Sequence, residues 1–147
     1  MEIVKKPLFT ATVAFASMLA SSHLLAATLS GALGDSSAAT DYYRITCSTN
    51  AAGASDMLSV ALLDVAPKAS PLISVQVIKA MSGQNTTDAI DGDALFSPAI
   101  NVKGGNGVYD VRVNKTAKGA ELYKLKYQCK SSGGKATGTA IATAQNQ

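Results

Sequence analysis

The chain has 147 residues, of which 16% are charged and 5% are aromatic. Its one histidine, His23, lies close to the start, so the rest of the chain lacks the side chain used most often for proton transfer near neutral pH. A hydrolase of the Ser-His-Asp type is thereby disfavoured, and we expect no enzymatic activity. The formal net charge of +3 is too small to indicate a nucleic-acid partner.

Residues 1–26 are expected to be an export signal. Lys5 and Lys6 form a basic start, residues 8–20 are mostly apolar, and small residues follow at Ala26 and Ala27, which is the order typical of a signal peptide. We expect cleavage after Ala26 or Ala27. Polar residues interrupt the apolar run, which is therefore too short for a spanning helix of about 20 apolar residues. The sequence predicts a secreted or periplasmic protein with no membrane span after cleavage.

The remaining chain of about 120 residues has the size of one domain. From Ala27 onward it contains eleven Lys and Arg and nine Asp and Glu, a net charge of +2. We expect a flexible N-terminal extension at 27–40, a β-sandwich domain at 41–130, and a C-terminal tail or final strand at 131–147.

Apolar residues of the expected domain alternate with a period of two, which is typical of strands. A weaker strand is expected at 95–102, where Pro98 indicates an edge strand or a bulge. The apolar faces of the five clearest strands are Tyr43, Ile45 and Cys47; Leu58, Val60 and Leu62; Ile73, Val75 and Val77; Tyr109, Val111 and Val113; and Tyr123, Leu125, Tyr127 and Cys129.

The two cysteines, Cys47 and Cys129, each fall on the apolar face of an expected strand. A disulfide through the core between two sheets is the simplest pairing in an oxidising compartment. Free buried thiols and an intermolecular bridge are the alternatives. Neither cysteine belongs to a CxxC motif, so the expected role is structural. The pattern predicts an all-β antiparallel β-sandwich, jelly-roll or immunoglobulin-like, with six to eight strands and one disulfide.

Short motifs add two resemblances. Tyr127-Gln128-Cys129 is similar to the Tyr-x-Cys element of immunoglobulin-like strands. The segments 41–43 (DYY), 107–113 (GVYDVRV) and 123–125 (YKL) resemble the D-x-Y, G-x-Y-x-V-x-V and Y-x-L strands of bacterial pre-peptidase C-terminal-like domains. The latter resemblance implies a non-catalytic accessory module, in some members bound to calcium or involved in attachment to polysaccharides and surfaces.

A candidate metal site is the group Asp88, Asp91 and Asp93, whose carboxylates are close in sequence around Gly92. Calcium prefers such oxygen-rich loops. The spacing does not match an EF-hand, which requires a closing Glu. A solvated turn explains the same residues, because short polar side chains bond to the local backbone there. Calcium is the one cofactor that the sequence suggests, and no other is expected.

Two candidate binding features concern charged and aromatic side chains. Lys124, Lys126 and Arg112 are expected to share an outward face, while the neighbouring tyrosines point inward. Single-stranded nucleic acids need aromatic and basic groups on the same surface, so a solvated face is favoured and no nucleic-acid partner is expected. Tyr42 lies opposite Tyr43 in its strand and offers an aromatic surface to a sugar or a protein; an ordinary edge tyrosine is the alternative.

The sequence therefore predicts a secreted, non-catalytic module for binding or adhesion at the bacterial cell envelope, with a cell-surface polysaccharide or protein as its partner. The alternative is a structural subunit of an extracellular fibre or matrix that self-assembles by strand donation. Residues 137–144 carry this alternative, because small and polar side chains alternate there as in a strand that can add to a neighbouring sheet.

Overall fold

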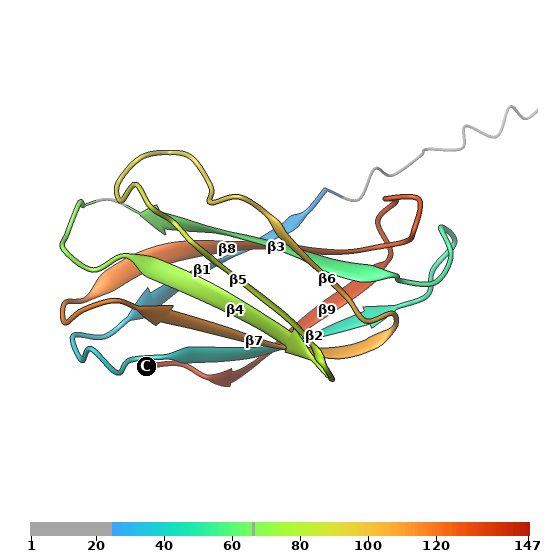
Figure 1. The fold of residues 1–147 in the computed structure, drawn as a ribbon, viewed down its shortest axis with the longest axis horizontal. Helices are drawn as coiled ribbons and strands as arrows, with labels where there is room; N and C mark the ends of the chain where they lie inside the picture. The colour runs from blue at the N-terminus through green and yellow to red at the C-terminus, as the bar shows by residue number, and fades with distance from the viewer. Residues whose placement is uncertain (1–24, 66) are drawn as a thin grey trace, which may run out of the picture.

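The computed structural model describes residues 25–65 and 67–147 of the chain. These residues form nine strands in two antiparallel sheets and contain no helix (Figure 1). A helix of the length and apolarity needed to cross a membrane is accordingly not found among them. Most of the expected export signal, including His23, lies outside the described residues.

The two sheets pack face to face, as Figure 1 shows. The four-stranded sheet has the order β1 (Ala27–Leu33), β8 (Glu121–Lys130), β3 (Met57–Val65) and β6 (Ile100–Lys103). The five-stranded sheet has the order β5 (Ser82–Thr87), β4 (Ile73–Lys79), β7 (Gly107–Lys115), β2 (Asp41–Ser48) and β9 (Gly138–Gln145). The predicted antiparallel β-sandwich is confirmed, with nine strands where six to eight were expected.

Strands β1 and β5 account for most of the difference. The segment 27–40, expected to be flexible, contains β1, which pairs with β8 along its whole length. β5 has the sequence SGQNTT and forms a hairpin with β4 across the two residues Ala80 and Met81. Both strands are rich in small or polar side chains, so their hydrophobic alternation is weak and hydrogen bonds to a neighbouring strand define them.

Two further expectations concern the segments 95–102 and 131–147. The weaker strand expected at 95–102 is shorter and later, at Ile100–Lys103, and it is an edge strand, as Pro98 indicated. The C-terminal segment forms β9, which pairs with β2 of the same chain.

The core lies between the sheets and is formed by the inward residues of every clear strand. Tyr109 and Tyr123 are among its largest fully buried side chains. β1 crosses directly over the Tyr123 ring at Gly31, where an added Cβ would lie 2.3 Å from the ring Cζ. Glycine is thus required at this point for β1 to reach its partner β8.

A disulfide between Cys47 of β2 and Cys129 of β8 joins the two sheets. The Cα atoms are 5.5 Å apart, and both residues are buried in the core. This confirms the intramolecular pairing expected from their faces. Because the sulfurs are covered, the bond is shielded from reductants in the folded state.

We expect removal of this disulfide to lower the free energy of unfolding by about 2–5 kcal/mol, because the bond closes a loop with a sequence separation of 82 residues. The measurement is urea unfolding of the C47A/C129A double variant. The wild-type protein unfolded in a reducing agent is the control and should match the variant. Equal midpoints for the oxidised wild type and the variant would contradict a stabilising role.

Candidate functional site

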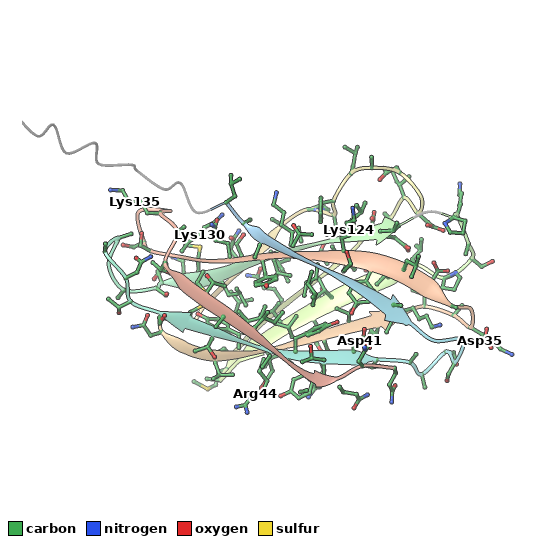
Figure 2. The ribbon with its side chains drawn as sticks, turned by 180° about the vertical axis from the view of Figure 1, so that it is seen from behind. Asp35, Asp41, Arg44, Lys124, Lys130 and Lys135 are labelled. Carbon is green, nitrogen blue, oxygen red and sulfur yellow. A yellow bond between two sulfur atoms is a disulfide. The ribbon has the colours of Figure 1, made fainter. Side chains whose placement is uncertain are left out.

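Ionisable side chains lie inside one end of the sandwich. β2 begins with Asp41, β8 begins with Glu121, β7 ends with Lys115, and Asp64 is the second-last residue of β3. Each lies in alternation with the apolar inward residues of its strand, and their exposed fractions are between 0% and 8%. The disulfide lies at the other end, near Lys130 and Lys135 in Figure 2. A disulfide therefore joins the two sheets at one end of the core, and buried ionisable side chains lie at the other end.

Asp41 is satisfied by hydrogen bonds. The Tyr123 hydroxyl donates to its Oδ2 at 2.5 Å, and the Gln147 backbone amide donates to its Oδ1 at 2.8 Å. The hydroxyls of Tyr43 and Tyr123 are 2.6 Å apart. Burial, followed by the hydrogen bond to Asp41, raises the pKa of Tyr123. This network has its partners within the chain, so we assign it a structural role.

Asp64, Asp91 and Glu121 form the second group, which we call the carboxylate cluster. One oxygen of each lies within 4.8 Å of the others, and all three residues are buried. Asp64 is at the end of β3, Glu121 is at the start of β8, and Asp91 comes from the loop between β5 and β6. Among the residues that the structure describes, this is the one group of three or more such side chains close enough to hold a metal ion.

Four oxygens of the cluster have no hydrogen-bond partner, namely both oxygens of Asp64, Oδ1 of Asp91 and Oε1 of Glu121. The other oxygen of Asp91 accepts from the Ala69 backbone amide. Buried carboxylates without partners are rare, because burial removes their hydration without replacing it.

The charges of the cluster oppose one another. Burial raises the pKa of Asp64 to about 7, and the negative charges of Asp91 and Glu121 add to this. The Ile73 backbone amide lowers it from nearby, although its geometry relative to the Asp64 oxygens is not that of a hydrogen bond. Burial and Asp91 likewise raise the pKa of Glu121, against the nearby Lys115, which lowers it. Three close carboxylates are thus not readily ionised together without a compensating positive charge.

The aspartates singled out in the sequence have three different environments. Asp91 belongs to the carboxylate cluster. Asp88 is buried beside it, where its Oδ2 accepts from the Asp64 amide at 2.7 Å and its Oδ1 from the Ile90 amide at 3.3 Å. Asp93 is half-buried and accepts from the Leu95 amide at 2.8 Å, as in a turn. The structure therefore groups Asp91 with Asp64 and Glu121, and not with Asp93.

Sequence reasoning missed Asp64 and Glu121, although a signal for both was present. Asp64 continues the alternation Leu58, Val60, Leu62 by one step. Glu121 extends the apolar face of β8 by one step before Tyr123. An acidic residue that continues the inward face at the end of a strand indicates a buried carboxylate. Two such residues, Asp64 and Glu121, together indicate a candidate ion-binding site.

Tyr42 is half-buried on the outer face of the five-stranded sheet. Its hydroxyl donates to Asp110 at 2.5 Å, and the Arg112 guanidinium lies 5.8 Å from the centre of its ring. The tyrosine is thus held within a charged group on its own sheet, and its role as a binding residue stays a prediction.

The expectation that Lys124, Lys126 and Arg112 share one outward face is wrong. Arg112 is on β7 of the five-stranded sheet, whereas the two lysines are on β8 of the four-stranded sheet. Figure 2 shows this separation of the two outer faces. Lys124 lies on one face, and Arg44 of β2, the strand that pairs with β7, lies on the other. Alternation gives the face of a strand but not the sheet to which the strand belongs, which is why the sequence combined them.

The outer face of the four-stranded sheet has charges of one sign. Its strands contain two acidic residues, Asp64 and Glu121, and both point inward. The basic residues on this face are Lys103, Lys124, Lys126 and Lys130. By contrast, the outer face of the five-stranded sheet pairs Arg44 with Asp110 across β2 and β7.

A trough of about 330 Å³ crosses the positive face. The small residues Ser59 and Ala61 of β3 form its floor, while Lys126 and Lys130 of β8 and Phe96 of the loop at 88–99 line it. The Lys126 ammonium lies 5.5 Å from the centre of the Phe96 ring. Ser97 fixes this part of the loop, since it donates to the Leu62 carbonyl at 2.7 Å and accepts from the Leu62 amide at 3.0 Å.

No protein-family model, curated protein or solved structure gives a significant match to this chain. The resemblance to pre-peptidase C-terminal-like domains therefore stays a prediction, and the function has to be argued from the site itself.

In the presence of a chelator, we expect the stability of the protein to fall as the pH rises from about 4 to about 7. Asp64 keeps its proton up to a pKa of about 7 in the folded state, against an ordinary value of 3.8. Between these values the folded state binds more protons, so raising the pH favours unfolding. Asp88, Asp91 and Glu121 are the charged groups that act on Asp64, and Lys115 acts on Glu121.

The measurement is the melting temperature in EDTA at a series of pH values, for the wild type and the D64N variant. Asparagine has no proton to lose, so the variant should show a flatter profile over this range. Identical profiles for the two proteins would contradict a raised pKa at Asp64.

Proposed function

We propose that the chain is an exported, non-catalytic β-sandwich module that binds an acidic polysaccharide at the bacterial cell envelope. The observation that carries this proposal is the outer face of the four-stranded sheet, where a trough lies among basic residues without an acidic neighbour on the strands. An open trough on a face with charges of one sign suits an extended polymer better than a small enclosed ligand.

The spacing of the lysines supports a polymeric ligand. Lys124 and Lys126 are two residues apart on β8 and point to the same side, so their Cα atoms are about 7 Å apart, and Lys130 continues the row. A chain with carboxylates or phosphates at regular intervals can contact several of these ammonium groups together. Phe96 at the wall of the trough supplies an apolar face for a sugar ring.

The position of the carboxylates supports a non-catalytic role. No Asp or Glu lines the trough, whereas cleavage of a glycosidic bond requires a positioned pair of carboxyl groups beside the substrate. The three buried carboxylates of the cluster lie at the end of the core, beneath the strands that form this face.

We expect the mature protein to bind oligogalacturonate, used as a probe of acidic polysaccharides, and not an uncharged dextran of equal length. The F96A/K126Q double variant should bind about tenfold more weakly, a loss of about 1.4 kcal/mol, because it removes the stacking face and one ammonium group. Calorimetry measures both affinities, which should decrease as the salt concentration rises.

The matched control is K118Q, since Lys118 is exposed and pairs with Asp35 in the turns at the other end of β8, away from the trough. Equal weakening by K118Q and F96A/K126Q would contradict a site in the trough. Tighter binding of a single-stranded oligonucleotide than of oligogalacturonate would replace the polysaccharide proposal with a nucleic-acid one.

The second candidate function is a structural subunit of an extracellular fibre or matrix assembled by strand donation. One observation favours it: β1 and β9 are edge strands of the two sheets, and neither contains a charged residue or a proline. Edge strands usually carry such residues as protection against pairing with another chain. The unpaired edge of β9 is therefore available for a strand of a second copy.

For this candidate we expect a large species in light scattering after size exclusion of the mature protein, and a monomer for the A140K variant. Ala140 is an exposed residue of β9, so lysine there adds a charge to the edge without entering the core. Equal melting temperatures of the two proteins would show that the variant is folded. A wild-type protein with the mass of one chain would contradict assembly.

A further inference from the structure

We propose that Asp64, Asp91 and Glu121 bind a calcium ion at the end of the core opposite the disulfide. This inference does not depend on the proposed function, because the three residues do not line the trough. It replaces the aspartate set expected from the sequence with one in which Asp91 is the shared member.

The geometry of the cluster fits a divalent cation with oxygen ligands. The three carboxylates approach one another within 4.8 Å. Calcium binds oxygens at about 2.3–2.6 Å, so two oxygens on one ion are at most about 5 Å apart. Three carboxylates supply between three and six oxygens, depending on how many bind through both atoms, and water completes the usual six to eight.

The unpaired oxygens are the independent observation that points to a ligand. Asp64 is fully buried, with an exposed fraction of 0%, and neither of its oxygens has a hydrogen-bond partner. Glu121 and Asp91 are 4% and 6% exposed, and each has one unpaired oxygen. One cation between the three residues would give a partner to the unpaired oxygens that face it, and none of these oxygens forms a hydrogen bond with a donor of the described residues.

The neighbouring charged groups leave an excess of negative charge. Asp88 is also negative, but backbone amides already occupy both of its oxygens. Among the described residues, Lys115 is the cation that acts on Glu121, and its ammonium group donates to the carbonyls of Gly34 and Gly119. A divalent ion would balance the charge that Lys115 leaves uncompensated.

The type of ligand selects the ion. The cluster offers oxygen atoms alone, whereas zinc and copper sites usually include histidine or cysteine. Both cysteines are in the disulfide at the other end of the sandwich. Magnesium requires a near-ideal octahedron, while calcium accepts an irregular set of carboxylates from separate segments, such as this one.

Bound calcium would connect three segments that are distant in the sequence. It would hold the loop at 88–99, through Asp91, against the end of β3 and the start of β8. Because only the folded chain brings the three together, binding should stabilise the fold as the calcium concentration rises.

The experiment uses the mature protein at pH 7.5 after treatment with EDTA and removal of the chelator. We expect calorimetry with calcium chloride to give one site per chain, and the melting temperature to rise with calcium concentration. Magnesium chloride should give a smaller rise. The F96A/K126Q variant should keep the full response to calcium, so that failure of polysaccharide binding and failure of this site are distinguishable.

The D64N and E121Q variants are the decisive test, because they keep the shape of each side chain and remove one negative charge. Both should melt at a higher temperature than the wild type without calcium, since repulsion is relieved, and both should lose the calcium-dependent rise. D93N is the matched control from the same loop and should respond as the wild type does. The absence of a response in the wild type, or its loss in D93N and not in D64N, would overturn the proposal.

Discussion

The structure depends on the alternation of side chains along β8, an inner strand of the four-stranded sheet that pairs with β1 and β3. Its inward residues include Glu121 of the carboxylate cluster, Tyr123 of the hydroxyl network and Cys129 of the disulfide. Its outward residues include the lysines of the positive face. A shift of one residue in the pairing would exchange the two sets, so one register determines the core, the bridge and the face together.

The two ends of the sandwich are held by opposite means. At one end a covalent bond joins the sheets, and its contribution does not depend on ionic conditions. At the other end carboxylates repel one another unless they are protonated or neutralised. The group whose pKa lies near neutrality, Asp64, is therefore at the end without the covalent link, while the disulfide keeps the sheets together at the other end.

Much of the fold could be predicted from the sequence, because the alternation of side chains along a strand is a local signal. The strands around Cys47 and Cys129 and their pairing are of this kind. β1 and β5 could not be recognised, since hydrogen bonds to distant strands define them rather than their own side chains. Half of the site could be predicted, because Asp91 was found in its loop. Its approach to Asp64 and Glu121 depends on the pairing of β3 with β8 and on the path of the loop at 88–99, which no local pattern contains.

The order of the strands also affects how the protein folds. The first two strands pair with the last two, β1 with β8 and β2 with β9, so each must meet a partner about a hundred residues later in the chain. During synthesis from the N-terminus, β1 and β2 are therefore complete long before these partners exist. Their backbone groups stay without these partners during this interval, so the two outer edges of the sandwich are completed last.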